Sequence, residues 1–248
     1  TKIWNEDKVA DFPSLAMKWF ASINTSSPET RKIAKKIIKH LQISPKEYRK
    51  TLSAVRAKLD VVEKKMSSGS WDEIEYSKVP SRAMMIYRNA FKRHNENGFE
   101  TFVKKVKSGE QKVNSSTLYP YDLMEKMDLD VGYRSELRNP EDILLEQWKA
   151  LPNYVEGENN ILVMADTSGS MSGRPMMTSV GLALYFAERN KGIFKDVFMT
   201  FSESPKMVKL VGNTLQEKVR CIESIVANTN LSKAFEQILS VCVKNKIP

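Results

Sequence analysis

A run of five apolar residues followed directly by a polar turn is the feature that most constrains this fold. Residues 161–165 are too few to span a membrane and include no polar side chain, which is typical of a strand buried on both faces of a parallel sheet. The turn after them, residues 166–173, brings Asp166, Ser168 and Ser170 at alternate positions, and its glycines permit a tight backbone. The sequence therefore predicts a buried strand that ends at a set of oxygen-bearing side chains.

This set of side chains suits a small, hard cation. Mg²⁺ prefers a few protein oxygens in octahedral array and keeps several waters, so one carboxylate and two hydroxyls form part of its shell and leave positions for a ligand. The alternative is an ordinary serine-rich turn between a strand and a helix, capped by Asp166. The motif lies between a predicted strand and a predicted helix that begins at Pro175, which is the context that a metal site of this kind requires. The sequence therefore favours the metal site.

The second half of the chain predicts a domain of the α/β class. The helix after the motif is apolar around most of its girth, as expected for a helix that packs on a sheet. Short apolar runs then predict two further strands, and capped amphipathic patterns predict two further helices. These elements are the helix 175–187, the strands 196–202 and 207–211, and the helices 213–225 and 231–239.

This order of elements and the Asp-x-Ser-x-Ser motif resemble the opening of a von Willebrand factor A domain, an α/β (Rossmann-like) fold. In that family the three motif side chains hold Mg²⁺ at the metal-ion-dependent adhesion site, and a threonine before a later helix joins them; Thr229 matches that place. The resemblance implies Mg²⁺, with Mn²⁺ or Ca²⁺ able to replace it, bound by Asp166, Ser168, Ser170 and Thr229.

The same resemblance implies a domain that is truncated after its third strand. Family members continue through further strands, and a later aspartate completes the metal shell, whereas this sequence ends at Pro248. With three strands alone, we expect the motif strand to lie at an exposed edge of the sheet, which favours aggregation.

Residues 1–150 are predicted to be α-helical, because apolar residues recur at helical spacing and none of this half alternates convincingly with period two. A capping box with a first-turn proline begins a long amphipathic helix over residues 44–69, and Pro80 begins another. We expect antiparallel helices packed in pairs, forming a helical domain at 1–150 that precedes a partial von Willebrand A domain at 151–248.

Short motifs in the helical half, taken with residues 151–239, resemble the domain-of-unknown-function family 2828, which joins a helical region to a C-terminal von Willebrand A domain. The architecture is also similar to that of the Ro autoantigen proteins, whose TROVE module is a ring of helical repeats that binds RNA. These resemblances imply a non-catalytic binding protein. The motifs are Trp71-x-x-Ile74, Val79-Pro80-Ser81, Phe91-Lys92-Arg93-His94 and Leu118-x-Pro120.

The net charge of +9 is concentrated in residues 31–120, which hold 21 Lys and Arg against 9 Asp and Glu. Such an excess attracts polyanions, although each single lysine is as well explained by a solvated helix face. RNA is the polyanion that we expect, with Trp71 and Tyr76 as exposed aromatic residues able to stack on bases. The predicted phosphate contacts are Lys35, Lys36, Lys39, Arg82, Arg88, Lys92, Arg93, Lys104 and Lys105.

Catalysis has no support in the sequence, and we expect no enzyme. His40 and His94 have no Ser, Cys or Asp at a catalytic spacing, and phosphate-loop, zinc and dinucleotide motifs are absent. Cys221 and Cys242 are interpreted as reduced thiols, which favours a cytoplasmic protein with no membrane partner. The rival to an RNA-binding scaffold is a metal-dependent adaptor, in which Mg²⁺ accepts a carboxylate from a partner protein.

Overall fold

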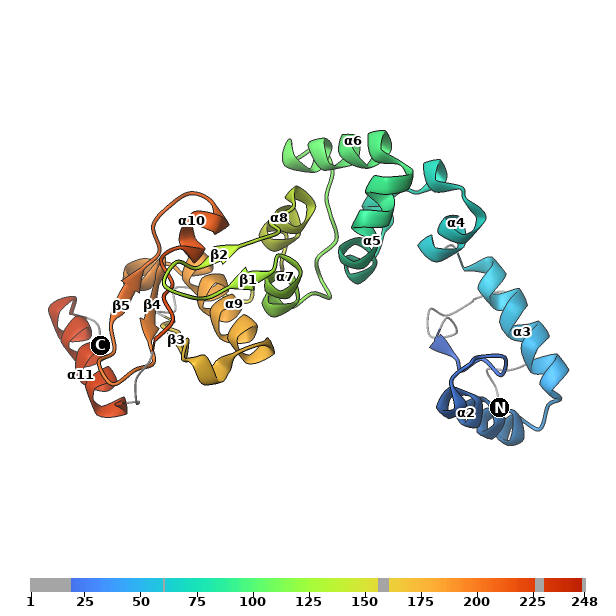
Figure 1. Ribbon diagram of the computed structural model, residues 1–248, viewed down its shortest axis with the longest axis horizontal. Coiled ribbons are helices and arrows are strands. Elements are labelled where there is room, and N and C mark those ends of the chain that lie inside the picture. Colours follow the sequence, from blue (N-terminus) through green and yellow to red (C-terminus); the bar gives the residue numbers. More distant parts are fainter. Residues whose placement is uncertain (1–18, 60, 156–160, 226–229, 247–248) are drawn as a thin grey trace. The chain divides into compact units, whose positions relative to one another are not determined.

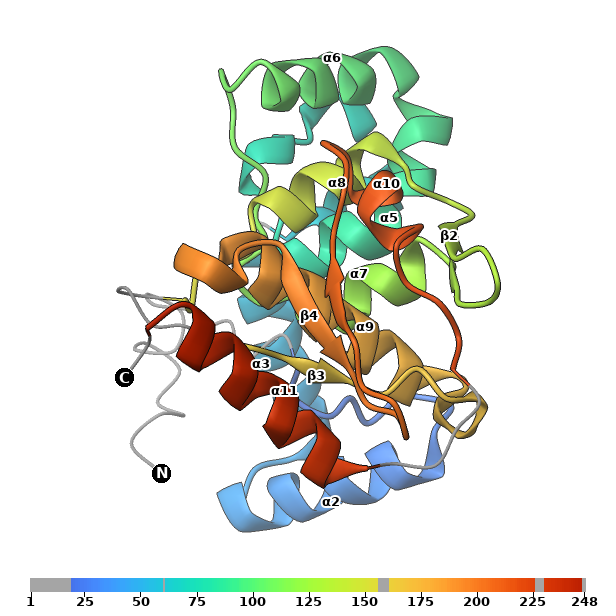
Figure 2. The ribbon, with the colours of Figure 1, turned by 90° about the vertical axis from the view of Figure 1, so that its left-hand side faces the viewer.

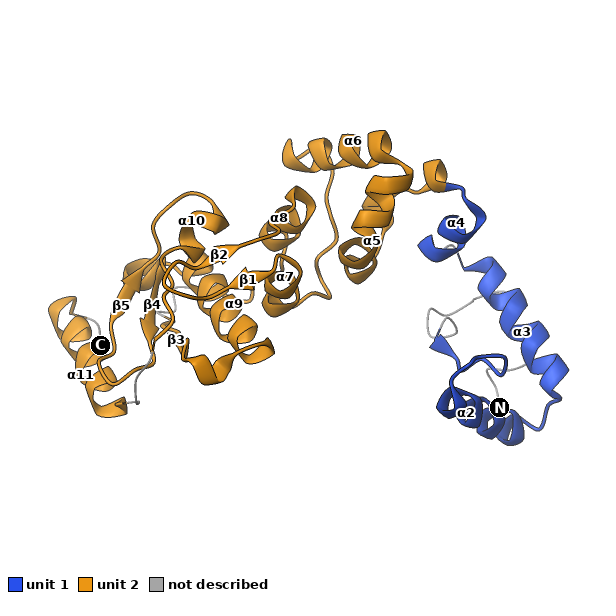
Figure 3. Cartoon of the chain, viewed as in Figure 1, with its two compact units in different colours: residues 1–70 blue, residues 71–248 orange. Residues whose placement is uncertain are grey.

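The computed structural model describes residues 19–59, 61–155, 161–225 and 230–246 (Figure 1). The chain divides into two units, residues 1–70 (unit 1) and residues 71–248 (unit 2) (Figure 3). The predicted helical half of the chain therefore contributes to both units, and the boundary placed after residue 150 stays a prediction about domain organisation.

Unit 1 is helical, with α2 at Pro28–Leu41, α3 at Pro45–Lys58 and α4 at Val62–Ser68. The predicted capping box at the start of α3 is confirmed, because the Ser44 hydroxyl accepts from the Glu47 amide and the Glu47 carboxylate accepts from the Ser44 amide. The single long helix predicted over residues 44–69 is wrong. Leu59 has extended backbone angles (φ −75°, ψ 118°) and ends α3 before α4 begins.

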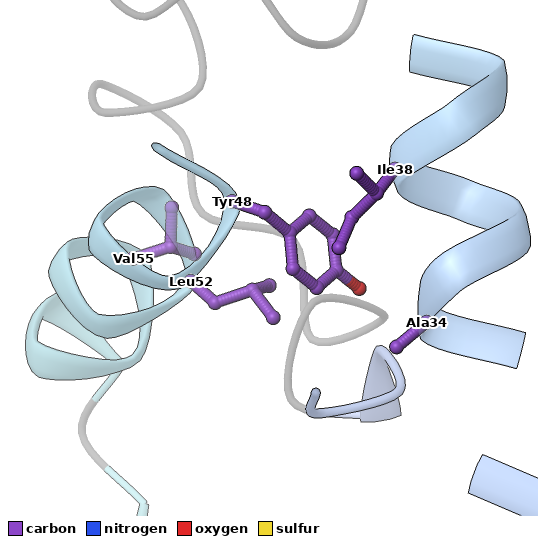
Figure 4. Packing of buried hydrophobic residues seen from close by; sticks show 5 residues of the cluster. All are labelled: Ala34, Ile38, Tyr48, Leu52 and Val55. Carbon is purple, nitrogen blue, oxygen red and sulfur yellow. The ribbon is translucent and has the colours of Figure 1, made fainter. Parts of the chain in front are cut away.

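The core of unit 1 lies between α2 and α3. Ala34 and Ile38 of α2 face Tyr48, Leu52 and Val55 of α3, and Figure 4 shows the tyrosine ring reaching across toward α2. The hydroxyl of Tyr48 donates to the carbonyl of Ala21 at 2.8 Å, and burial raises the pKa of this phenol. Core packing and this hydrogen bond together hold the chain segment before α2 against α3.

The first part of unit 2 is also helical. Two 3₁₀ turns lead into α5 (Ser81–His94) and α6 (Glu96–Lys107), and α7 (Pro120–Lys126) and α8 (Asp142–Lys149) follow. Between α7 and α8 lies a short antiparallel pair of strands, β1 (Leu129–Asp130) and β2 (Glu136–Leu137), in the half of the chain that the sequence predicts to be helical. Two residues per strand are too few to leave a period-two pattern in the sequence.

The second part of unit 2 is a small mixed α/β region, as the sequence predicts at this coarse level. Its three-stranded sheet has the order β3-β4-β5, with β3 parallel to β4 and β4 antiparallel to β5. The elements, in the predicted sequence order, are β3 (Met164–Ala165), α9 (Arg174–Arg189), β4 (Val197–Thr200), β5 (Met207–Lys209), α10 (Leu215–Val219) and α11 (Leu231–Lys244).

Strand β3 lies at the edge of this sheet, because within the described residues it pairs with β4 alone. Ala165 is buried, but Met164 and residues 161–163 are only half-buried. The prediction of a strand buried on both faces therefore holds for its last residue and is wrong for the rest, since an edge strand has a neighbour on one side only.

The sheet lies between two helices, α9 on one face and α11 on the other (Figures 1 and 2). Helix α9 also packs closely against α7, which joins the helical part of unit 2 to its sheet. Helix α11 buries Ala234 but leaves its apolar side in solvent, at four residues spaced one turn apart. The exposed fractions are 52% for Leu231, 65% for Phe235, 64% for Leu239 and 69% for Val243.

A partly buried ionic network links three of these helices. Glu188 of α9 accepts a hydrogen bond from the indole of Trp148 at 2.7 Å and pairs with Lys218 of α10 at 3.1 Å; Lys218 also reaches Asp196 at 3.4 Å. Burial alone would lower the pKa of Lys218, but the two carboxylates outweigh it and the pKa is raised. The network ties α8 to the α/β elements within one unit.

The two cysteines are free thiols. Cys221 and Cys242 are both half-buried, and Cys221 contacts the backbone around Val211. Within the described residues, no helix is both long enough and apolar enough to cross a membrane.

Candidate metal site and basic surfaces

The loop after β3 brings the three predicted metal ligands of the motif together. The amide of Ser168 donates to the Asp166 carboxylate at 2.8 Å, and this contact orients the carboxylate toward the turn. A 3₁₀ turn, Gly169–Met171, then places the hydroxyls of Ser168 and Ser170 in a hydrogen bond with each other at 2.9 Å. The two hydroxyls and the Asp166 carboxylate therefore share one loop at the carboxyl end of the edge strand.

The spacing of the two hydroxyls matches one edge of a magnesium octahedron. With Mg–O distances of about 2.0–2.1 Å, neighbouring ligand oxygens lie about 2.9 Å apart. Asp166 would add a carboxylate oxygen, so the donor set present fits part of an Mg²⁺ shell. Thr229, the fourth predicted ligand, lies outside the described residues. The described part of the chain contains no cluster of three His, Cys, Asp or Glu able to hold a metal.

A later segment of the chain lies beside this loop. The Thr167 hydroxyl donates to the carbonyl of Glu223 at 2.7 Å, and the Ile225 amide donates to the carbonyl of Thr167 at 3.2 Å. Beyond the gap, the Asn230 amide donates to the carbonyl of Ser202 at 3.2 Å. The chain is therefore fixed, on both sides of residues 226–229, near the carboxyl ends of β3 and β4.

An aromatic and cationic cluster lies where the loop after β3 enters α9. The guanidinium of Arg174 lies 4.6 Å from the ring centre of Tyr121, and this ring stacks on Tyr119 with centres 5.5 Å apart. Tyr119 keeps 59% of its surface exposed. This cluster leaves no signal in the sequence, because the contact of Arg174 with α7 depends on how α9 packs.

The predicted phosphate contacts are divided between the two units. Lys35, Lys36 and Lys39 are exposed on α2 of unit 1. The other six belong to α5 and α6 of unit 2, where Arg82, Lys92, Arg93, Lys104 and Lys105 are exposed.

Arg88 and Arg82 already have partners in the protein. Arg88 is 8% exposed and donates both to Glu141 at 2.8 Å and to the carbonyl of Met85 at 2.7 Å. Its burial argues against the predicted phosphate contact. Arg82 shares its guanidinium with Asp122 at 3.1 Å but remains half-exposed.

The charge of the chain follows the division into units. Residues 1–70 hold 15 Lys and Arg against 7 Asp and Glu, a net charge of +8, whereas residues 71–248 hold 24 against 23, a net charge of +1. Within residues 31–120, the part in unit 1 holds 12 Lys and Arg against 3 Asp and Glu, and the part in unit 2 holds 9 against 6, so about three quarters of the basic excess belongs to unit 1.

Two comparisons with known proteins bear on this chain. Residues 8–160 match the family model described as Domain of unknown function (DUF2828). The chain belongs to the DUF2828 family. Residues 160–248, which include the loop after β3, match a second model, Domain of unknown function (DUF7788).

A relative of this DUF2828 chain occurs in a giant virus. It is similar to Uncharacterized protein L728 of Acanthamoeba polyphaga mimivirus, with 30% identity over 233 residues, which cover 87% of this chain and 40% of that protein. The chain thus spans two fifths of the length of that relative. No solved structure matches this chain.

Both aromatic residues predicted to be exposed in the DUF2828 region lie in contacts with other rings. Tyr76 is 7% exposed and meets the edges of Phe91 and Phe99, so the prediction of a base-stacking role for it is wrong. Trp71 is half-buried and stacks on the imidazole of His94, with ring centres 4.2 Å apart. Aromatic residues in this region mainly build the core between α5 and α6.

A basic pocket in unit 1 of the DUF2828 chain was not predicted. It has a volume of about 520 Å³ and lies between α3 and the segment before α2. Lys46, Arg49, Lys50 and Arg56 line it. A sequence signal was present: three cations stand in the first two turns of α3, where acidic residues are the rule.

Proposed function

We propose that this DUF2828 chain is a non-catalytic RNA-binding scaffold, in which unit 1 binds the phosphate backbone and the C-terminal α/β region offers a Mg²⁺-dependent docking point. The observation that supports it best is the net charge of +8 on unit 1, beside +1 on unit 2. A local excess of this size draws in polyanions at long range, whereas cations scattered over a neutral surface do not.

Two further observations support RNA as the polyanion. The cations of α2 and α3 are exposed except for half-buried Arg56, so they are accessible to a backbone. The order of a helical region before an α/β region is similar to that of the Ro autoantigen proteins, whose helical repeats bind RNA. Similarity of architecture alone is a weak guide to function, so the charge remains the main support.

The α/β region is proposed to be a von Willebrand A-type domain. A parallel pair of strands connected through α9, with Asp166, Ser168 and Ser170 at the end of the first strand, supports this assignment. Mg²⁺ would be held by these three side chains, with Mn²⁺ or Ca²⁺ able to replace it. The bound cation would attract an anionic oxygen of a ligand, and the loop residues would fix where that oxygen docks.

The test of RNA binding is its response to salt. Fluorescence anisotropy with a labelled single-stranded RNA of about 20 nucleotides, between about 50 and 200 mM KCl, gives the slope of log K against log salt. We expect a steep negative slope, since each neutralised phosphate of a single strand contributes about 0.7. A flat response, or no binding, would remove the proposal.

Charge-matched variants show which unit binds the RNA. Replacing Lys35, Lys36 and Lys39 with Gln removes three charges from unit 1, and replacing Lys92, Arg93 and Lys104 removes three from unit 2. We expect the unit 1 variant to weaken binding and flatten the slope by about 2, and the unit 2 variant to change it far less. Equal effects would contradict a role specific to unit 1.

A second candidate function is a metal-dependent adaptor that binds a protein carboxylate without nucleic acid. The observation that supports it is the position of the Ser168 and Ser170 hydroxyls in the same loop as Asp166: they hydrogen-bond at 2.9 Å, a separation that is also compatible with two ligands of one cation. Calorimetric titration with MgCl₂ tests the site. We expect Asp166→Ala to abolish Mg²⁺ binding with an unchanged circular dichroism spectrum, and Glu100→Ala, which removes an exposed carboxylate on α6, to retain it. Equal Mg²⁺ binding by both variants would exclude the adaptor.

A further inference from the structure

The pocket of unit 1 is open to solvent and lies between two segments of the chain. One wall is the polar side of α3, and the other is formed by Ser22, Ile23 and Asn24. Among the residues that the structure describes, the lining includes four cations and no carboxylate: it is formed by Ser22, Ile23, Asn24, Lys46, Tyr48, Arg49, Lys50, Leu52, Ser53 and Arg56. Its volume of about 520 Å³ is within the range of pockets that hold small ligands, about 300–1,000 Å³.

The cations of this pocket oppose the stability of their own helix. Lys46, Arg49 and Lys50 lie in the first two turns of α3, where the helix dipole is positive. Lys46 is also three and four positions from the other two, and like charges at this spacing destabilise a helix. An anion held in the pocket would relieve both repulsions.

The acidic residue in the first turn does not offset these charges at the pocket. Glu47 is the one carboxylate there, and it accepts from the Ser44 amide at 3.3 Å as part of the capping box. Glu47 is not among the residues that line the pocket. The positive potential of the pocket is therefore left for a ligand.

The wall of the pocket opposite α3 is fixed by hydrogen bonds before any ligand arrives. Arg56 donates to the carbonyl of Phe20 at 2.7 Å, and Tyr48 donates to the carbonyl of Ala21 at 2.8 Å. Both side chains come from α3 and hold the segment that leads into Ser22–Asn24. A site with prearranged walls loses less entropy on binding than a mobile surface does.

We propose that this pocket binds a phosphate group of an RNA nucleotide, through Lys46, Arg49 and Lys50. The proposal rests on the RNA-binding function above and adds a specific position to it. Guanidinium and ammonium groups form strong, charge-assisted hydrogen bonds with phosphate oxygens. The lysines of α2 contribute to the long-range attraction, whereas the pocket orders one phosphate.

The experiment compares two variants of the full chain that lose the same charge. The pocket variant is Lys46→Gln/Arg49→Gln/Lys50→Gln, and the control is Lys32→Gln/Lys35→Gln/Lys36→Gln on α2. Fluorescence anisotropy with the same single-stranded RNA gives the RNA affinity of each variant. Competition by free ATP tests whether the phosphates of a single nucleotide also bind in the pocket. Arg49→Lys keeps the charge, and thermal melting of each variant reports folding.

We expect the pocket variant to lose about tenfold more RNA affinity than the control, because it removes direct contacts in addition to net charge. Arg49→Lys should keep most of the affinity, and ATP should compete with RNA on the wild type but not on the pocket variant. Equal losses of RNA affinity in the two triple variants would overturn the proposed phosphate site. RNA binding by distributed charge would then remain.

The remaining outcomes separate the pocket from the RNA-binding function. A wild type that binds ATP through the pocket residues but binds no RNA would overturn the RNA-binding function and keep the pocket as a site for free nucleotides. Absence of binding to both probes would overturn both proposals. If the triple pocket variant fails to melt cooperatively, the Arg49→Glu single variant takes its place. Unchanged RNA affinity in Arg49→Glu would count against the pocket.

Discussion

Gly181 lets helix α9 approach α7 closely. A Cβ atom at this position would lie 3.2 Å from the carbonyl carbon of Pro120 and 3.3 Å from the Cγ of Met124. These distances are shorter than ordinary van der Waals contact, and one of the partners is backbone, which moves with difficulty. The absence of a side chain at one residue thus sets the separation of the two helices that join the helical and sheet-containing parts of unit 2.

Replacing Gly181 with Val should destabilise unit 2. The branched side chain would push α9 away from α7, at a cost of about 1–3 kcal/mol, which exceeds the gain of about 1 kcal/mol from removing a helical glycine. Urea unfolding followed by circular dichroism measures the change. Leu182→Val, at a neighbouring position that is 38% exposed, is the control and should cost less than about 1 kcal/mol. A Gly181→Val protein as stable as the wild type would show that the helices can separate freely.

Local spacing predicts that the motif side chains share one loop. The Ser168 amide donates to the Asp166 carboxylate, and the hydroxyls of Ser168 and Ser170 form a hydrogen bond, because residues two apart in a tight turn lie close together. Metal binding by these residues stays a prediction. Arg88 and Tyr76 could not be predicted in the same way. Their burial depends on Glu141 and on the rings of α5 and α6, which approach from elsewhere in the sequence.

At the scale of elements, helical periodicity identified helices but not their ends. Val55, Leu59 and Val62 are all buried, so the apolar stripe continues from α3 into α4 although the backbone is extended at Leu59. A side-chain pattern reports which face is covered and is insensitive to a break of a few residues. Capping residues gave better boundaries: Ser27 and Ser44 mark the starts of α2 and α3.

The order of strands and helices in the α/β region was predictable, but the burial of the elements was not. An apolar run predicts a strand, yet whether both of its edges are paired depends on strands elsewhere in the sheet. Strand β3 is at the edge within the described residues, and α11 leaves Phe235 and Leu239 in solvent. Periodicity alone cannot distinguish an apolar face that is covered from one that is not.

At the scale of the whole chain, the net charge differs between the two structural units, whose boundary lies after residue 70. Unit 1 concentrates a net charge of +8 within 70 residues, whereas unit 2 is close to neutral with +1 over more than twice that length. Summed repulsion of this kind destabilises a folded unit even when individual side chains are well solvated. Unit 1 should therefore be the part of the chain whose stability depends most on ions in solution.

Hydrogen exchange measured at two salt concentrations tests this dependence, with unit 2 as the internal reference. Raising NaCl from about 20 to 300 mM shortens the screening length from about 20 Å to below 10 Å, which weakens repulsion among the cations of α2 and α3. We expect amide exchange in these helices to slow several-fold, and exchange in α5 and α9 to change little. Faster exchange in unit 1, or equal slowing in both units, would show that self-repulsion does not limit its stability. Sodium phosphate at the same ionic strength should slow unit 1 further, since a bound anion adds to screening.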